Sequence, residues 1–140
     1  MHRLTGGCRC GNFKVTLTLS KPPAEFVARE CGCSFCVSRN GRHVSDPAGK
    51  VEIAIADESQ WNKHRFGTAT CDFMICKKCD GYMGAIGDTP AGLKAVVSVW
   101  CLDTPDAFVK TAPSDFEGES VGDRLARRAR NWTPAIVKIG

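Results

Sequence analysis

Hydrophobic and polar residues alternate along several short segments of the chain. In the clearest one, residues 12–19, the side chains of Phe13, Val15, Leu17 and Leu19 fall on one face, as a half-buried β-strand requires. The prolines at positions 22 and 23 end this segment. Comparable patterns predict strands over residues 24–30, 51–55, 64–66, 70–75 and 93–100, with a turn or short helical start at 57–61.

The remaining segments give weaker signals. Residues 84–92 are rich in small residues and predict a loop between strands. No helical periodicity occurs before residue 120, and residues 123–130, with few apolar positions, predict a short surface helix or a loose tail. The predicted fold class is therefore mainly β, with one domain over residues 1–110 and a basic C-terminal extension over residues 111–140.

Composition agrees with a globular chain of one domain. Of its 140 residues, 43% are hydrophobic and 24% are charged, which are ordinary values that favour neither disorder nor a membrane protein. Apolar runs such as residues 95–100 are far shorter than the roughly 20 residues that span a bilayer. Residues 1–7 lack the apolar stretch of a secretory signal, which favours the cytoplasm. A net charge of +4 is too weak by itself to indicate nucleic-acid binding.

Cysteine is the unusual component, with nine residues in the chain. An odd number leaves one cysteine unpaired in a pure disulfide framework, and in a reducing compartment cysteines are more often ligands or catalysts. Seven of the nine form three clusters, Cys8/Cys10, Cys31/Cys33/Cys36 and Cys76/Cys79. This grouping predicts metal binding, with buried inert thiols as the alternative.

Two of the clusters are pairs that each present two thiolates from a tight turn. Together they supply the four soft ligands that a tetrahedral zinc site prefers, and such a closed site normally stabilises structure. The trio Cys31, Cys33 and Cys36 offers three sulfur atoms without an obvious local fourth. Three protein ligands and an open position are typical of catalytic zinc.

Spacing alone leaves alternatives open. It does not decide which pairs share an ion, and Cys71 or Cys101 could complete a second closed site with the trio. We interpret both of these cysteines as packed side chains instead, because Cys71 lies inside an alternating segment and Cys101 follows Trp100.

Other candidate residues carry weaker signals. The isolated histidines at positions 2, 43 and 64 are assigned no role. Residues 39–43 follow the trio and either hold a carboxylate through arginine or form an ordinary polar loop. A solvated helix face is favoured over a nucleic-acid contact for the C-terminal cluster of Arg124, Arg127, Arg128, Arg130 and Trp132.

The motifs Gly6-Gly7-Cys8-Arg9-Cys10-Gly11, Cys31-Gly32-Cys33-Ser34-Phe35-Cys36 and Ile75-Cys76-Lys77-Lys78-Cys79 occur in this order, with an alternating strand after the first. Over residues 5–103 the sequence resembles the glutathione-dependent formaldehyde-activating enzyme family, which is related to centromere protein V. The resemblance implies a β-tent of small antiparallel sheets around cysteine–zinc sites.

The resemblance also implies two zinc ions with different roles. Cys8, Cys10, Cys76 and Cys79 would hold a structural zinc, and Cys31, Cys33 and Cys36 would hold a catalytic-type zinc. The implied activity is that of a carbon–sulfur lyase acting on S-hydroxymethylglutathione or a related thiol–aldehyde adduct, so the expected partner is a small thiol such as glutathione, without a membrane or nucleic acid.

Two positions differ from the usual family pattern. Val37-Ser38 stand where the family usually has a basic pair, and Asp80-Gly81 stand where it favours Gly followed by Thr or Ser. A zinc-stabilised binding module without catalysis is therefore the second hypothesis, and a redox or metal-buffer protein is the third.

Overall fold

The computed structural model describes residues 2–31, 42–64, 71–114 and 120–139. These residues form eleven strands and one α-helix, so the predicted mainly-β fold class is confirmed. The first strands are β1 (His2–Gly7), β2 (Phe13–Leu19), β3 (Val27–Cys31), β4 (Arg42–Val44), β5 (Lys50–Ile55) and β6 (Trp61–His64). The later elements are β7 (Asp72–Cys76), β8 (Tyr82–Thr89), β9 (Gly92–Ser98), β10 (Lys110–Ser114), α2 (Val121–Asn131) and β11 (Thr133–Ile139).

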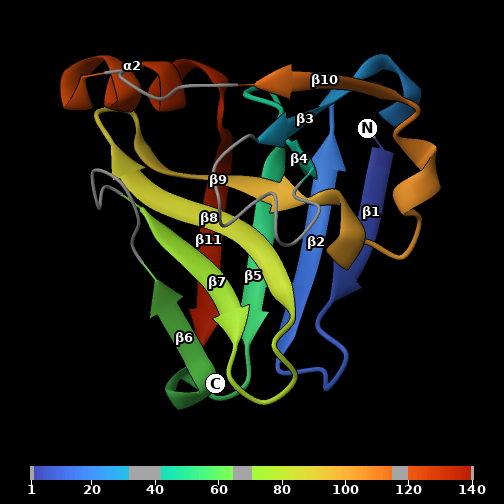
Figure 1. Ribbon diagram of the computed structural model, residues 1–140, viewed down its shortest axis with the longest axis vertical. Helices are drawn as coiled ribbons and strands as arrows, with labels where there is room; N and C mark the ends of the chain where they lie inside the picture. The colour runs from blue at the N-terminus through green and yellow to red at the C-terminus, as the bar shows by residue number, and fades with distance from the viewer. Residues whose placement is uncertain (1, 32–41, 65–70, 115–119, 140) are drawn as a thin grey trace.

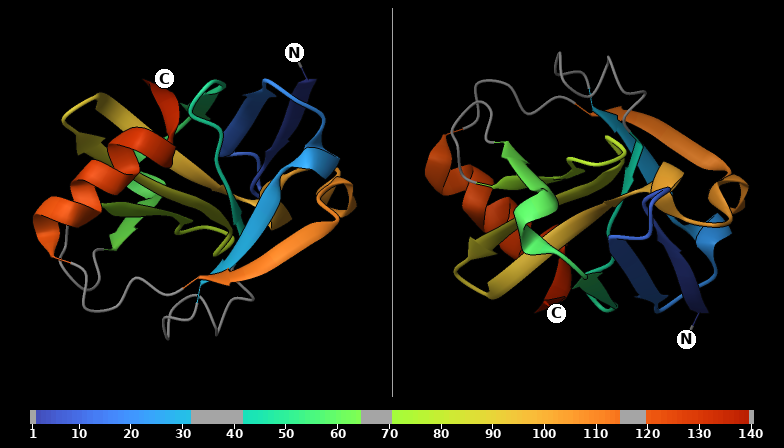
Figure 2. Two further views of the ribbon diagram at one scale, coloured as in Figure 1. Left: turned by 90° about the horizontal axis from the view of Figure 1, so that it is seen from above. Right: turned by 90° about the horizontal axis from the view of Figure 1, so that it is seen from below.

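The strands form one curled sheet (Figures 1 and 2). Its main path runs β1-β2-β5-β11-β9-β4-β3-β10, and β8 leads from β9 through β7 to β6. Most neighbours are antiparallel, but β11 pairs with β5 and β10 pairs with β3 in parallel. The β1–β2 and β7–β8 connections lie at the same end of the molecule, at the bottom of Figure 1.

The alternating segments form the strands that the sequence predicts. Phe13, Val15 and Leu17 of β2 stand opposite Ile55, Ile53 and Val51 of β5. All six side chains are buried, and they form the centre of the hydrophobic core. Since successive strand residues point to opposite faces, the intervening polar residues lie on the other face of the sheet.

The loop predicted over residues 84–92 is wrong for residues 84–89, which belong to β8, and right for residues 90 and 91, which form the turn before β9. The small residues of β8 allow this strand to pack closely between β7 and β9. A Cβ atom at Gly84 would lie 2.1 Å from the backbone oxygen of Val96, and its φ of +136° also excludes most other residues. The first part of the segment, residues 84–86, is therefore a buried stretch of strand, and Gly84 has no room for a side chain.

The final strand, β11, belongs to the predicted C-terminal extension but lies inside the sheet. Ala135 of β11 stands opposite Val51 of β5, and Thr133 stands opposite Ala95 of β9. The helix α2, immediately before β11, includes the predicted helical residues 123–130. It lies beside β8 and β9 (Figure 2). Its first turn is capped by the Ser120 side chain, which accepts a hydrogen bond from the backbone of Asp123.

The other boundaries shift by a few residues. The predicted strand at 24–30 begins with a 3₁₀ turn, Pro23–Glu25, before β3. The predicted strand at 93–100 ends two residues early, where the 3₁₀ turn Val99–Cys101 begins. The expected short helical start at 57–61 is the 3₁₀ turn Glu58–Gln60, capped by Asp57. Residues 65–70, which complete the two predicted strands around them, lie outside the described part.

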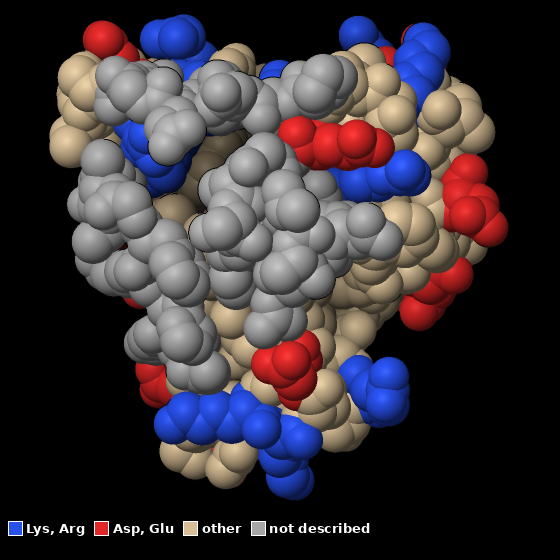
Figure 3. Space-filling view, in the orientation of Figure 1, with Lys and Arg blue, Asp and Glu red and all other residues tan. Residues whose placement is uncertain are grey.

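Within the described residues, no helix has both the length and the apolar character needed to cross a membrane. The face seen in Figure 3 has Lys and Arg side chains interspersed with Asp and Glu around its margin. This part of the surface therefore shows no large patch of one charge.

Asp46 joins three parts of the fold. Its carboxylate accepts hydrogen bonds from the backbone N–H and hydroxyl of Ser20, at 2.7 and 2.8 Å, and from the backbone N–H of Ala48 at 2.9 Å. Its own backbone N–H donates to the Thr133 hydroxyl at 2.8 Å. Burial alone raises the pKa of Asp46, but the hydrogen bonds from Ser20 and Ala48 outweigh it, and the pKa is lower than the ordinary 3.8.

We predict that Asp46→Asn lowers the free energy of unfolding by about 2–3 kcal/mol near pH 7, because charge-assisted hydrogen bonds to a buried carboxylate are lost. A depressed pKa in the folded state stabilises the fold above the unfolded-state pKa, and this stabilisation is lost as the pH falls through the folded-state value. The difference between wild type and variant should therefore shrink below a pH of about 4. Urea unfolding at several pH values measures it.

The matched control is Asp103→Asn, since the exposed Asp103 carboxylate accepts one hydrogen bond, from the Thr5 hydroxyl at 2.9 Å. This variant should lose much less stability. Equal losses in the two variants at pH 7 would contradict the role assigned to Asp46.

Candidate metal centre

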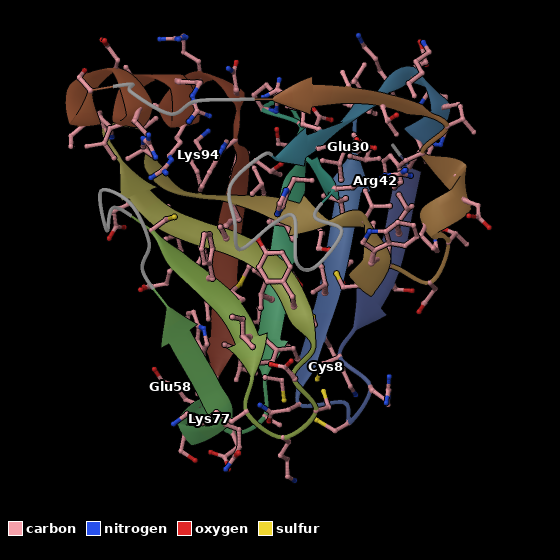
Figure 4. All side chains as sticks on the ribbon, in the orientation of Figure 1. Cys8, Glu30, Arg42, Glu58, Lys77 and Lys94 are labelled. Carbon is pink, nitrogen blue, oxygen red and sulfur yellow. The ribbon has the colours of Figure 1, made fainter. Side chains whose placement is uncertain are left out.

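Four cysteines from two distant parts of the chain meet at one end of the sheet. Cys8 and Cys10 lie in the β1–β2 connection, Cys76 ends β7, and Cys79 lies in the β7–β8 connection. Their four sulfur atoms all lie within 4.8 Å of one another. In Figure 4 these sulfur atoms gather around the labelled Cys8. We call this group the four-cysteine cluster.

The distances within the four-cysteine cluster suit a shared metal ion. The sulfur of Cys10 lies 3.6 Å from that of Cys8 and 3.5 Å from that of Cys76. A disulfide would require about 2.05 Å. In a tetrahedral zinc site with bonds of about 2.3 Å, neighbouring sulfur atoms are about 3.8 Å apart. The cluster could therefore hold a metal ion with only small side-chain adjustments.

Backbone hydrogen bonds shape both cysteine loops. In the first loop, the backbone N–H of Cys8 donates to the oxygen of Phe13 at 3.1 Å, and the N–H of Phe13 donates to the Cys8 sulfur at 3.2 Å. In the second loop, the N–H of Asp80 donates to the oxygen of Cys76 at 2.8 Å. Each loop is thus closed by hydrogen bonds before any ion is considered.

The two loops lie close together at Gly81. A Cβ atom there would lie 3.0 Å from the Cβ of Cys8 and 3.4 Å from the sulfur of Cys79. The residue before it, Asp80, has a φ of 58°, which is a left-handed conformation that Asp tolerates better than most residues. The tight turn and the missing side chain together bring Cys79 toward Cys8.

The thiols of Cys8, Cys76 and Cys79 differ in acidity because their surroundings differ. Burial raises the pKa of Cys76 to about 12 and also raises that of Cys8. Burial acts in the same direction on Cys79, but backbone N–H groups of Cys10 and Gly81, with the neighbouring thiols, outweigh it and lower the pKa to about 6. Near neutral pH, Cys79 is therefore ionised more readily than Cys8 and Cys76. Binding a metal ion would release protons from Cys8 and Cys76.

The trio is only partly within the described residues. The backbone of Cys31 ends β3 and pairs with Ser114 of β10. Cys33 and Cys36 lie outside the described part of the chain. The structure therefore brings together the predicted structural ligands and does not describe the predicted catalytic set.

The other two cysteines are buried, as the sequence analysis expected. Cys101 belongs to the main hydrophobic core, its thiol lies 3.8 Å from the backbone oxygen of Met83, and burial raises its pKa to about 12. Cys71 packs in a smaller cluster with Ala85 and Trp132. Neither joins the four-cysteine cluster.

The segment after the trio contains a contact network that the sequence did not predict. The Nε atom of Arg42 lies 3.1 Å from a carboxylate oxygen of Glu30, and both are labelled in Figure 4. The Arg42 guanidinium also lies 5.4 Å from the ring centre of Trp100. His43 lies 2.7 Å from the hydroxyl of Tyr82, through its Nε2 atom. His43 and Tyr82 are 39 positions apart, so spacing gives no signal of their contact.

The C-terminal arginines do not form a uniform solvated face. Arg128 is 6% exposed, and its guanidinium lies 4.7 Å from the ring centre of Trp132, which is itself buried. Arg130 is exposed, and Arg124 and Arg127 are half-buried. The favoured interpretation of a solvated face is therefore wrong for Arg128, since it packs against the end of the helix.

These observations define a small mainly-β protein with a cysteine cluster of metal-binding type. The family model for glutathione-dependent formaldehyde-activating enzymes matches residues 3–117. The chain belongs to that family.

A solved structure supports the fold independently. The crystal structure of a Rhodobacter sphaeroides protein has a TM-score of 0.59 to this chain, at 20% sequence identity. The match covers 79% of this chain and 99% of the other. At this identity the likeness concerns the fold alone.

We predict that Cys10→Ser removes the ion held by the four-cysteine cluster and lowers the melting temperature. Cys10 is exposed, so the substitution costs little packing and the loss would come from the missing ligand. Elemental analysis of protein produced with zinc, together with thermal unfolding, measures both effects.

Cys101→Ser provides the matched control, because it makes the same chemical change at a buried cysteine outside the cluster. It should retain the full metal content. A Cys10→Ser protein with unchanged metal content would show that these sulfur atoms hold no ion.

Proposed function

We propose that this chain is a zinc-dependent carbon–sulfur lyase that interconverts a small thiol and an aldehyde with their hemithioacetal. The expected substrate is S-hydroxymethylglutathione, formed from glutathione and formaldehyde, or a related adduct. Family membership supports this class of reaction. The observation that carries the proposal is the four-cysteine cluster, because it accounts for two of the three cysteine motifs and leaves the third for another role.

The two sets of cysteines would hold ions of different function. Cys8, Cys10, Cys76 and Cys79 form a complete tetrahedral donor set and would hold a structural zinc ion. Cys31, Cys33 and Cys36 would hold a second ion with an open position. A zinc ion there would supply a Lewis acid that lowers the pKa of a bound thiol.

The fold supports the second site through β3. Arg29 and Glu30 of this strand pair with β4 on one side and with β10 on the other, and Cys31 pairs with Ser114 of β10. Catalytic groups held on such an element are positioned more accurately than groups on an unsupported loop. We expect β3 to fix the first member of the trio.

The reaction itself requires no oxidant or reductant. The thiol loses its proton, its sulfur forms a bond to the carbonyl carbon, and the carbonyl electron pair moves to oxygen, which takes up a proton. The reverse reaction breaks the carbon–sulfur bond. Cysteine ligands must remain reduced to bind zinc, so this proposal places the protein in a reducing compartment such as the cytoplasm.

We predict that the zinc-loaded protein accelerates exchange between glutathione, formaldehyde and their adduct above the spontaneous rate. Exchange NMR measures the rate directly, and 2-mercaptoethanol and cysteine in place of glutathione test the choice of thiol. Acceleration with another thiol alone would retain the reaction class and change the substrate. No acceleration with any of the three would overturn the proposed function.

A second prediction concerns the number of ions. Wild type should bind two zinc ions per chain, and Cys33→Ser should bind about one while keeping its fold, because only the catalytic-type site loses a ligand. Elemental analysis and circular dichroism measure these outcomes. Loss of folding in Cys33→Ser would instead assign a structural role to the trio.

The C-terminal residues give little support to the alternative hypothesis, a binding module without catalysis. Stacking of a nucleic-acid base on Trp132 would require an accessible ring, whereas this ring is 6% exposed and lies beneath Arg128.

A further inference from the structure

Cys10 is the exposed member of the four-cysteine cluster. Cys8 and Cys79 are half-buried, and Cys76 is fully buried. Oxidation of a thiol requires access for the oxidant as well as thiolate character. All four ligands share the thiolate character, because a thiol must lose its proton to bind a metal ion. Access therefore distinguishes Cys10 as the sulfur that an oxidant in solution would reach first.

Cys76 and Cys8 both place a sulfur atom close to that of Cys10, at 3.5 and 3.6 Å. A bond to Cys76 would join two loops that are 66 positions apart, whereas a bond to Cys8 would close a ring across Arg9 alone. Short rings are stiff, and strain makes a disulfide easier to reduce. The Cys8 sulfur also accepts a hydrogen bond from the backbone N–H of Phe13 at 3.2 Å. These features favour Cys76 as the partner of Cys10.

The loop that carries Cys76 is held by hydrogen bonds that do not involve an ion. The backbone N–H of Cys76 donates to the oxygen of Gly81 at 2.9 Å, and that of Lys77 donates to the oxygen of Gln60 at 2.7 Å. These contacts fix the position of Cys76 whether or not an ion is bound. The distance between its sulfur and that of Cys10 would have to shorten by about 1.5 Å to reach the S–S bond length of about 2.05 Å. Rotation of the exposed Cys10 side chain can supply most of this movement.

We propose that a peroxide oxidises Cys10 and that the product is a disulfide between Cys10 and Cys76, which takes the place of the bound ion. The inference concerns the four-cysteine cluster and does not depend on the lyase activity. With two of its four sulfur atoms joined, the cluster no longer offers a tetrahedral set of thiolates, so the ion is released. The two loops remain connected, now by a covalent bond.

The reaction with hydrogen peroxide has two steps. The Cys10 thiolate attacks one peroxide oxygen, the O–O bond breaks and hydroxide leaves, so Cys10 becomes a sulfenic acid. The Cys76 thiolate then attacks the Cys10 sulfur, the S–O bond breaks and a second hydroxide leaves. Each hydroxide takes up a proton from the solvent and becomes water. The peroxide gains two electrons, and the two sulfur atoms together lose two.

A disulfide of this kind suits a protein whose cysteines are otherwise reduced. In reducing compartments, disulfides are usually transient and often sense oxidants. A thiol reductant regenerates both thiols by exchange, and the reduced cluster can bind zinc again. The bridge keeps the β1–β2 and β7–β8 connections together in the meantime, because it links the same two loops as the ion.

Tryptic peptide mapping tests the bridge, because trypsin separates the four cysteines of the cluster. The peptides that carry them are residues 4–9 with Cys8, 10–14 with Cys10, 66–77 with Cys76, and 79–94 with Cys79. Zinc-loaded protein is treated with a few equivalents of hydrogen peroxide, and the remaining thiols are alkylated before digestion. We expect a linked species of peptides 10–14 and 66–77. Fragment spectra should place the bond at Cys76 and not at Cys71, which lies on the same peptide.

Two variants serve as a matched pair in the same mapping. Cys76→Ser should abolish the linked species, whereas Cys71→Ser should retain it. A link between peptides 4–9 and 10–14 in wild type, in place of the expected one, would overturn the inference. Oxidation of Cys10 to a sulfinic acid without any link would overturn it as well. The wild-type map decides even where a variant fails to fold.

Elemental analysis follows the ion. Oxidised wild type should lose at least one zinc ion per chain, and reduction with dithiothreitol followed by added zinc should restore it. A linked protein that retains all of its zinc would show that the bridge does not replace the ion, and this result would overturn the inference.

Thermal unfolding measures whether the bridge holds the loops together. Oxidised wild type and Cys10→Ser treated with the same peroxide both lack the ion of the cluster, but only the wild type has the bridge. Its melting temperature should be higher by roughly 10 °C, since a cross-link that closes a long loop stabilises the fold. Equal melting temperatures would contradict the proposal that the disulfide takes the place of the ion.

Discussion

The meeting of two cysteine loops is the constraint on which the rest of the structure depends. Residues 8–10 and 76–79 are far apart in sequence, and their sulfur atoms come within 4.8 Å of one another at one end of the curled sheet. This contact sets the distance between two antiparallel strand pairs, β1–β2 and β7–β8. Both loops are closed by their own hydrogen bonds, and the absence of a side chain at Gly81 leaves room for Cys8 beside it. Because an ion bound there would be absent from the unfolded chain, its binding free energy would add directly to the stability of this arrangement.

A second, purely apolar constraint holds the middle of the sheet. β2 and β5 bury a regular set of large side chains, and β11 then pairs with β5 in parallel and with β9 at its beginning. The last strand therefore connects the β1–β2–β5 part of the sheet to the β8–β9 part. Asp46 strengthens this join, since it is hydrogen-bonded to both Ser20 and Thr133. The family match ends at residue 117, so this strand lies beyond the matched region although it is central to the sheet of this chain.

The sequence predicts the strands whose hydrophobic pattern is local, and it fails where the reason for a residue lies in another strand. The sequence predicts β2 because every second side chain of this strand is apolar and enters the core, namely Phe13, Val15, Leu17 and Leu19. In the sequence Gly84 resembles a loop residue. The reason for a glycine there is the backbone of Val96 on the neighbouring strand, which leaves no room for a side chain, and the sequence does not reveal this contact. The four-cysteine cluster is predictable because thiolate pairs at short spacing have a specific chemistry. The contact between His43 and Tyr82 is not, since both residues are common in other roles and the fold alone brings them together.

One hairpin connects the four-cysteine cluster with the strand that ends at Cys31. Tyr82 begins β8 three residues after Cys79, so whatever fixes the β7–β8 turn also fixes the start of that strand. From Tyr82 the hydrogen bond to His43 reaches β4, and β4 pairs with the strand that ends at Cys31. Each step is a direct contact between described residues, and none requires a change of conformation. An ion in the four-cysteine cluster would thus influence, through these contacts, the position of β4 and of the strand that ends at Cys31.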